Sequence, residues 1–465
     1  MSHITFPLLT SGGEPYYLQL YRHILKEIQK GGLQAGEKLP SKRTLAQHLS
    51  VSVNTVDAAY QMLTTEGYLR AAPKSGFYVC PLPQLPTPQR PLSPPPPPQA
   101  PKASFPFDCS PGSADPSAFP FATWGKLTRE VMGQGELLSK GEAQGDLCLR
   151  QALCRYLHQY RGVQCQPHQV LIGAGMEYLL TLLCCLLPTE TVYAMEEPGY
   201  PKAAQSFRNL GRKVVHIPVD KDGMDSAKLE ESGACCAYLT PSHQFPTGGV
   251  MPAPRRAQML RWAAEQEGRY LIEDDYDSEY RYAGRPIPAL QGSDLHDRVI
   301  YCGTFSRSLA PSFRIAYRVL PVSLLPAYHR LFSLQSSTVS RFEQHTLCRF
   351  LEEGYWERHL NRTRILYKKR REELTSSLKA SPLGPSLEIL GSQAGLHFLL
   401  RFHGGLSEEE MARKAWEQGV DLLPLSHCYH DPVLAPPSTL LCGYGRLPLE
   451  EIPALTQALV RAWTN

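Results

Sequence analysis

Residues 303–311 read GTFSRSLAP and follow an apolar run, Val299-Ile300-Tyr301. A short run of β-branched and aromatic residues that stops at a glycine predicts a buried strand. Two hydroxyls and two guanidiniums come within eleven residues after it: Thr304, Ser306, Arg307 and Arg314. Such a set can clamp an anion, although packing and surface ion pairing would use the same residue types.

A second predicted strand, Val170-Leu171-Ile172, leads through a glycine-containing turn that includes Ala174 and Gly175 into an apolar helix over 176–187. Free N–H groups at the start of a helix suit a phosphate. The same turn also joins strands to helices where no ligand binds.

A third predicted strand, Tyr270-Leu271-Ile272, runs into the acidic segment EDDYD at 273–277, which includes Asp274 and Tyr276. This segment is compatible with a metal site, a solvated loop, or a carboxylate that keeps a ligand nitrogen protonated. Tyr200 lies on the proline-stiffened turn EPGYP at 197–201, where its ring either packs or stacks on a ligand.

The alternation of short apolar runs with helical segments predicts an α/β body over residues 107–465 with a mostly parallel sheet. In such sheets, ligands bind outside the carboxyl ends of the strands. Each of the candidate binding residues named so far follows a predicted strand, so we expect these residues to meet at one edge of the sheet.

A proline-rich segment separates this body from the N-terminal part of the chain. Residues 81–106 contain twelve of the forty-one prolines, five of them consecutive at 94–98. Proline lacks the N–H and fixes φ, which excludes a helix or a central strand. We therefore predict either a semi-rigid polyproline spacer or a disordered tether between two folded units.

Residues 1–80 are predicted to form a small helical head. Apolar residues with helical spacing at 21–28 precede Gly31-Gly32, Ser41 can cap a second helix, and Ser52 can cap a third helix that runs to about Glu66. Residues 68–70 and 77–79 then predict a two-stranded wing whose tip carries Lys74. Helix spacing alone fits a small interaction domain as well as a helix-turn-helix.

Charge and composition narrow the class of protein. The net charge of the whole chain is +4, and residues 16–80 alone hold eight Lys or Arg against four Asp or Glu, so positive charge is concentrated in the head. The thirteen cysteines include no C-x-x-C pair, which favours reduced thiols over disulfides or zinc ligands. With neither a signal peptide nor a stretch long enough for a membrane span, we expect a cytoplasmic protein.

The strings LPSKRTLA, VSVNTVDAAYQMLTTEGYL and SGFYV, in this order across the head, resemble the GntR-type winged helix-turn-helix. The resemblance implies binding to a double-stranded DNA operator. In that motif the start of the last helix meets base edges, and neighbouring basic and hydroxyl groups meet phosphates. The residues expected at the DNA are Ser41, Lys42, Arg43, Ser52, Asn54, Thr55 and Lys74.

The strings TPSHQFPTG (240–248), EDDYDSEYRY (273–282) and GTFSRSLAP resemble the MocR/GabR subfamily of GntR-family regulators. The resemblance implies that the head is fused to a fold-type-I aminotransferase-like domain, a family that uses pyridoxal 5′-phosphate (PLP). It implies that Tyr200 stacks on the pyridine ring, Asp274 pairs with the ring nitrogen and Tyr276 meets the phenolic oxygen. The phosphate would be surrounded by Ala174, Gly175, Thr304, Ser306 and Arg314.

Arg307 stands where this family carries the lysine that forms the Schiff base with PLP. A guanidinium stays protonated in proteins, so it cannot form that imine, although it can still bind an anion. The internal aldimine is thereby excluded, and ordinary transamination with it. A second departure is Leu441, at the position where many relatives carry an arginine for the ligand carboxylate; Arg446 follows nearby.

Three hypotheses follow for the whole chain. The first is a non-enzymatic transcription regulator whose body binds a PLP-related compound or a small amino compound as effector, non-covalently or as a ligand adduct. The second is a PLP-free regulator with a degenerate dimerisation domain, and the third is a PLP-dependent aminotransferase, against which Arg307 argues. In the first two we expect a homodimer that reads two half-sites, with no membrane partner and no metal.

Overall fold

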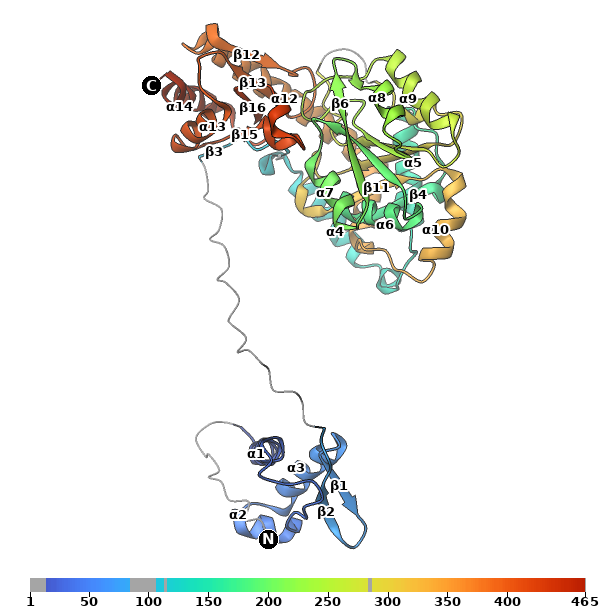
Figure 1. The fold of residues 1–465 in the computed structure, drawn as a ribbon, viewed down its shortest axis with the longest axis vertical. Coiled ribbons are helices and arrows are strands. Elements are labelled where there is room, and N and C mark those ends of the chain that lie inside the picture. Colours follow the sequence, from blue (N-terminus) through green and yellow to red (C-terminus); the bar gives the residue numbers. More distant parts are fainter. Residues whose placement is uncertain (1–13, 84–105, 113–114, 283–286, 465) are drawn as a thin grey trace. The chain divides into compact units, whose positions relative to one another are not determined.

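The computed structural model describes residues 14–83, 106–112, 115–282 and 287–464. The chain divides into two compact units, Met1–Pro101 and Lys102–Asn465, which we call the head and the body and describe separately (Figure 1). Most of the predicted proline-rich spacer, residues 84–105, lies outside the described residues. No described helix is long and apolar enough to cross a membrane.

The head is a three-helix unit with a hairpin. Its elements are α1 (Tyr16–Lys30), α2 (Lys42–Leu49), α3 (Val53–Thr65), β1 (Leu69–Ala72) and β2 (Gly76–Val79). Gly31 ends α1 in the left-handed region at φ 78°, where its N–H meets the last carbonyls of the helix. The hydroxyls of Ser41 and Ser52 accept the N–H groups of Thr44 and Thr55 as N-caps. The predicted helix starts and the wing are therefore present, and one core joins the three helices to the hairpin.

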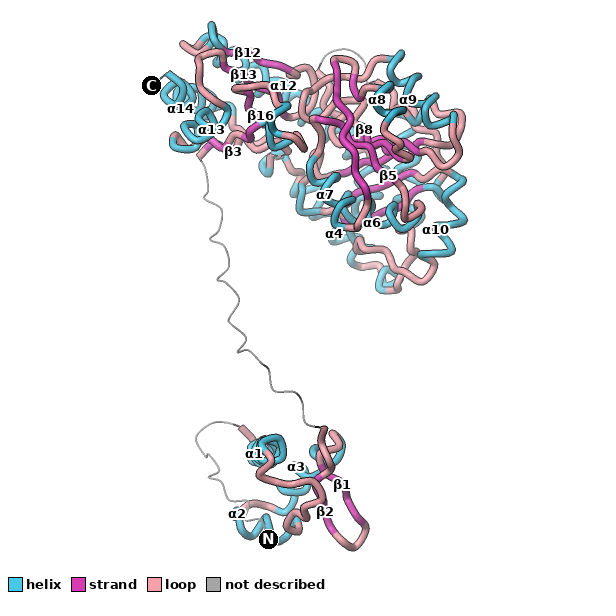
Figure 2. The backbone as a smooth tube through the Cα atoms, in the orientation of Figure 1, coloured by secondary structure: helices cyan, strands magenta, loops and turns pink. Residues whose placement is uncertain are grey.

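The body is built on an eight-stranded mixed sheet, seen at its centre in Figure 2. In spatial order the strands are β4 (Val170–Ala174), β11 (Ile315–Val319), β10 (Val299–Thr304), β9 (Tyr270–Asp275), β8 (Cys236–Leu239), β5 (Val192–Glu197), β6 (Lys213–Asp220) and β7 (Gly223–Met224). The run from β10 to β6 is parallel, whereas β11 is antiparallel to both of its neighbours. The fold class predicted from the sequence is confirmed.

Helices cover both faces of this sheet, because successive residues of each strand point to opposite sides. Leu171 and Met195 pack with α6 (Met176–Leu186), α7 (Pro201–Asn209) and α10 (Leu325–Phe332) on one face. Val170 and Ile172 pack with α4 (Phe121–Met132), α5 (Leu147–Arg161) and α11 (Arg341–Glu352) on the other. Ala194 and Leu271 pack on that second face with α8 (Ser226–Glu231) and α9 (Ala253–Glu265).

A smaller C-terminal layer follows the long helix α12 (Tyr355–Ala380). Its antiparallel sheet has the order β12 (Leu387–Leu390), β13 (His397–Phe402), β16 (Thr439–Gly443) and β15 (Leu423–Pro424). Helices α13 (Glu408–Glu417) and α14 (Ile452–Thr464) contribute to its core, and a short parallel pair joins β3 (Phe107–Asp108) to β14 (Val420–Asp421). Figure 1 shows this layer beside the main sheet.

Candidate functional site

The strand ends that the sequence singled out meet at one edge of the main sheet. In the registers of β11 with its neighbours, Ile315 pairs with Ala174 of β4, and Ala316 pairs with Thr304 of β10. The carboxyl ends of β4 and β10 therefore lie on either side of the start of β11. Gly175 follows β4 as the N-cap of α6, with φ 92°, so the free N–H groups of α6 open at this edge.

Gly175 lies against the Arg314 guanidinium and has a φ of 92°, a conformation that L side chains rarely adopt. A Cβ on Gly175 would lie 2.2 Å from Nη2 of Arg314. Arg314 in turn donates to Glu177 Oε2 at 2.6 Å, in a half-exposed ion pair. A guanidinium beside free helix N–H groups can form a cradle for an anion. Glu177 already accepts a hydrogen bond from one of the guanidinium nitrogens.

Two hydroxyls complete the cradle on the β10 side. The hydroxyl of Thr304 donates to the hydroxyl oxygen of Ser306 at 2.9 Å, and the Ser306 N–H donates to Thr304 Oγ1 at 3.1 Å. This turn holds both side chains together at the end of β10. A phosphate at this edge would find backbone N–H, hydroxyl and guanidinium donors, the set expected of a phosphate site.

Asp274 is buried in β9, with 5% of its surface exposed, and offers one free oxygen. Its Oδ2 accepts the hydroxyl of Tyr238 from β8, whereas its Oδ1 has no partner among the described residues. Burial raises the pKa of this carboxyl to about 6, against opposing effects of the Tyr238 hydrogen bond and the Arg307 charge. A protonated pyridine nitrogen would supply both the donor and the charge that Oδ1 lacks.

Two tyrosines, Tyr276 and Tyr200, lie close to Asp274. The Tyr276 hydroxyl lies 2.9 Å from Nδ1 of His243, and the same nitrogen lies 3.0 Å from both carboxylate oxygens of Asp277. Tyr200 meets Phe245 edge to face at 5.7 Å between ring centroids. Burial raises the pKa of Tyr200 to about 12, an effect to which the Asp274 charge adds, so Tyr200 stays a neutral phenol.

Arg307 points into the same region. Its guanidinium carbon lies 5.5 Å from the centroid of the Tyr276 ring, within range of a cation–π contact. Its Nη1 is buried and has no hydrogen-bond partner among the described residues, and Gly112 leaves room for it, since a Cβ there would lie 2.5 Å from Nη1. The guanidinium therefore stands in this pocket with unused donors.

The second departure found in the sequence also has a structural counterpart. Leu441 is fully buried on β16 and packs with Tyr276 and Phe245 in a small apolar cluster. Arg446 pairs instead with Asp108 at 2.8 Å. Neither residue therefore places a free guanidinium where the relatives would bind a ligand carboxylate.

The acidic segment does not converge on one point. Glu273 accepts the N–H groups of Leu290 and Gln291, and Asp275 pairs with Arg161 at 2.7 Å. Glu273 and Asp275 thus lie on one face of the sheet and Asp274 lies on the other, which argues against a metal site built from these three carboxylates.

One other group among the described residues has metal-ligand chemistry: His243, Asp277 and His397, whose ligand atoms lie within 4.8 Å of one another. Burial lowers the pKa of His397 far below its usual value, and the charges of His243 and Arg307 act in the same direction. A cation here would be repelled by the Arg307 guanidinium. We therefore read the His243–Asp277 pair as hydrogen-bonding support for Tyr276.

The residues present fit a phosphorylated pyridine. The cradle would hold its phosphate, Asp274 Oδ1 would face the ring nitrogen, Tyr276 would face the phenolic oxygen and Tyr200 would face the ring. Tyr238 and His243, which hold two of these side chains, were not assigned roles from the sequence. Tyr238 lies within an apolar strand and gives no pattern, whereas His243 is part of the TPSHQFPTG string.

In the head, three of the residues expected at the DNA are exposed and have no hydrogen-bond or ion-pair partner among the described residues: Arg43, Asn54 and Lys74. The other four already have intramolecular partners. Ser41 and Ser52 cap helices, the Thr55 hydroxyl lies 2.8 Å from that of Ser52, and Lys42 pairs with Asp57. Asn54 lies in the first turn of α3, and Lys74 lies in the turn of the hairpin with φ 59°.

Comparisons with known proteins agree with both units. Residues 16–79 match the family model "Bacterial regulatory proteins, gntR family", and residues 112–440 match "Aminotransferase class I and II". The chain is 40% identical to the HTH-type transcriptional regulator YdeL of Bacillus subtilis over 97% of both chains. It is 35% identical to the "Probable rhizopine catabolism regulatory protein MocR" of Rhizobium meliloti, over 92% of this chain and 90% of that protein.

Among solved structures, the multiple substrate aminotransferase from Thermococcus profundus is 26% identical and superposes with a TM-score of 0.69, covering 78% of this chain and 92% of that one. The aminotransferase fold of the body and the DNA-binding motif of the head are therefore both established. The chain belongs to the MocR subfamily of the gntR family of DNA-binding transcription regulators, in which a winged helix-turn-helix head is joined to an aminotransferase-like body.

Proposed function

We propose that this regulator binds a PLP-related compound in the body without covalent attachment and uses it to sense an amino compound. The observation that carries the proposal is the combination of a full set of donors for the phosphate and a free, buried Asp274 Oδ1 with Arg307 in the position of the lysine. Binding and covalent chemistry use different residues at this site, so the first can persist without the second.

The body is not proposed to catalyse transamination. The reaction requires a neutral amine at this position to take up the proton that leaves the substrate carbon, whereas a guanidinium stays charged. When bound, the cofactor would supply an electron-withdrawing pyridinium ring. Asp274 would hold the proton on the ring nitrogen, and Tyr276 would donate to the phenolic oxygen. Arg307 would place its positive charge beside a bound anion or carbonyl oxygen.

In the head we propose that Asn54 reads a base edge in the major groove of operator DNA and that Arg43 and Lys74 contact phosphates. Their exposure and lack of intramolecular partners support this assignment. Ser41, Ser52, Thr55 and Lys42 would set the position of these residues and add contacts at the same surface. We propose a cytoplasmic homodimer, because two heads are needed for tight binding to a two-part operator.

The decisive experiment is a titration of purified full-length protein with PLP, followed by borohydride treatment and gel filtration. We expect saturable binding with about one PLP per chain, seen as a change in absorbance, that is lost on gel filtration and leaves no reduced adduct. A bound fraction that survives borohydride and denaturation would contradict non-covalent binding. If PLP does not bind at all, the PLP-free regulator is the correct alternative.

A further inference from the structure

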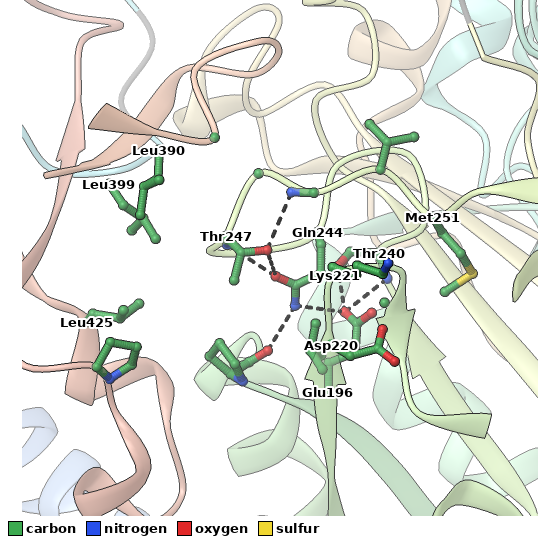
Figure 3. Close-up of a pocket in the computed structure, with 18 of the residues that line it drawn as sticks. Glu196, Asp220, Lys221, Thr240, Gln244, Thr247, Met251, Leu390, Leu399 and Leu425 are labelled. Carbon is green, nitrogen blue, oxygen red and sulfur yellow. Dashed lines mark hydrogen bonds between the residues drawn. The ribbon is translucent and has the colours of Figure 1, made fainter. Parts of the chain in front are cut away.

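One cavity of the body is lined by none of the candidate cofactor residues. It has a volume of about 580 Å³ and lies between the carboxyl ends of β5 and β6, the 240–251 loop, and the small C-terminal sheet. Figure 3 shows its two walls: polar side chains from the main sheet and the 240–251 loop on one side, and Leu390, Leu399 and Leu425 on the other. A volume of this size is typical of a small-molecule site.

Glu196, at the end of β5, is the buried acid of the polar wall, with 3% of its surface exposed. Its Oε2 accepts the hydroxyl of Thr240 at 2.6 Å and the N–H of the same residue at 3.2 Å. Its Oε1 is also buried but has no hydrogen-bond partner among the described residues. A buried carboxylate oxygen without a donor is costly, and a ligand that brings a donor would remove that cost.

Several other polar side chains of the lining already have partners. The Gln244 amide donates to Pro198 O at 2.8 Å, and its oxygen accepts the hydroxyl of Thr247 at 2.6 Å. Asp220 pairs with Arg255 at 2.7 Å, and Arg401 pairs with Glu388 at 3.3 Å. Lys221 is exposed, so water screens its charge.

The local charge favours a cation over an anion at Glu196. Burial raises the pKa of Glu196 to about 7, and the negative charge of Asp274 acts in the same direction. An ammonium group at Oε1 would offset both effects, because an opposite charge within hydrogen-bond distance favours the ionised carboxylate. Charge-assisted hydrogen bonds of this kind are about twice as strong as neutral ones.

We propose that this cavity is a second ligand site, which binds an organic amine with a hydrocarbon body. Its ammonium group would donate to Glu196 Oε1, and its hydrocarbon part would lie against Leu390, Leu399 and Leu425. The site is separate from the proposed PLP site, because none of the residues assigned to the cofactor lines it.

The test uses full-length protein free of PLP, so that the amine has no aldehyde to react with. Calorimetric titration with n-pentylamine is compared with n-pentanol, which has the same hydrocarbon chain and no charge. We expect the amine to bind about tenfold more tightly than the alcohol, and Glu196→Gln to remove that difference while leaving alcohol binding unchanged. Equal affinity of the two compounds for the unmodified protein would overturn the proposal, and so would an unchanged amine affinity in Glu196→Gln.

A second variant and a control separate the local effect from a change in folding. Leu390→Lys places a positive charge on the opposite wall at a partly exposed strand end, and it should weaken amine binding at least as much as Glu196→Gln. Asp222→Asn removes a carboxylate near the cavity but outside its lining, and it should leave the amine affinity unchanged. If Leu390→Lys binds the amine normally, the site is wrongly placed. Failure of PLP to bind would leave each of these results unaffected.

Discussion

The head and the body differ in how their functional residues are spread along the chain. In the head, every residue assigned to DNA lies between positions 41 and 74, on two capped helices and a hairpin. In the body, the residues assigned to the cofactor range from Ala174 to Arg314 and meet only because β4, β10 and β9 end at one edge of the sheet. The head depends on local structure, whereas the body depends on the assembled sheet.

They also differ in how completely they match the chemistry of their folds. The head has the caps, the exposed Asn54 and the basic wing of a DNA-binding unit. In the body we propose a phosphate cradle and a role for the Asp274 carboxylate, whereas the covalent chemistry would need a lysine where Arg307 stands. A binding site can thus keep its scaffold while one side chain decides which reactions are possible.

The largest effect is expected from Arg307→Lys, which would give the body an amine where its fold places one. Unlike a guanidinium, a lysine amine at this position can lose its proton and react with the PLP aldehyde. We expect borohydride-reducible attachment to rise from none to about one PLP per chain. Mass spectrometry of the peptide that contains position 307 measures it.

The matched control for that change is Arg307→Gln, which removes the guanidinium and adds no amine. This variant should bind PLP without any reducible adduct. Covalent attachment in Arg307→Gln, or its absence in Arg307→Lys when that variant binds PLP, would show that the Schiff-base position has been misassigned.

The next largest effect concerns pH and Glu196. Burial raises the pKa of this carboxyl from 4.5 to about 7, so the folded protein holds the proton more tightly than the unfolded chain does. The stability that it contributes is complete below about pH 4.5 and is lost as the pH rises through 7. Glu196→Gln should therefore remove a change of about 3 kcal/mol in the free energy of unfolding across this pH range.

Denaturant unfolding of wild type and Glu196→Gln at pH 5 and pH 8 checks this prediction. Glu273 and Asp274 are also buried, and their raised pKa values of about 7 and about 6 affect both proteins, so only the difference between them isolates Glu196. The head has no buried carboxyl among its described residues, and its unfolding should not show this dependence. Parallel pH profiles for the two proteins would contradict the expected pKa of Glu196.

A smaller effect is expected from Gly175→Ala in the phosphate cradle. The new Cβ would lie 2.2 Å from Arg314 Nη2, at a φ of 92° that strains any L side chain. We expect PLP affinity to fall by roughly 2 kcal/mol, or about thirtyfold. Gly211→Ala is the matched control, because Gly211 has φ 70° and nothing within 4 Å of its Cβ position, and PLP affinity should not change there.

The head could be predicted from the sequence more fully than the body, because the head depends on local structure and the body on the assembled sheet. Ser41, Ser52 and Gly31 act within a few residues of their own positions, so the helix starts, one helix end and the wing follow from local patterns. In the body, the runs at 170–172, 270–272 and 299–301 correctly predicted three strands and the mostly parallel sheet.

Contacts between distant residues were beyond reach of the sequence patterns. The Tyr238 hydroxyl reaches Asp274 from a neighbouring strand, and Glu177 reaches Arg314 across 137 positions. The cavity beside Glu196 joins the main sheet to the small one, so no single segment carries a signal for it. Packing at the level of side chains decides these features, and it depends on the complete fold.

The smallest effects separate two kinds of contact in the head. Asn54→Ala should weaken binding to an operator selected from random-sequence DNA by about tenfold, because an amide that reads a base edge is worth roughly 1–3 kcal/mol of discrimination. Its affinity for unrelated DNA should stay nearly constant. Lys74→Ala should weaken both by a similar factor and reduce the salt dependence of binding by about one phosphate contact. Fluorescence anisotropy at several salt concentrations measures all four quantities. An equal loss on both DNAs for Asn54→Ala would move Asn54 from the bases to the backbone, and the head would then recognise its operator through other residues of α3.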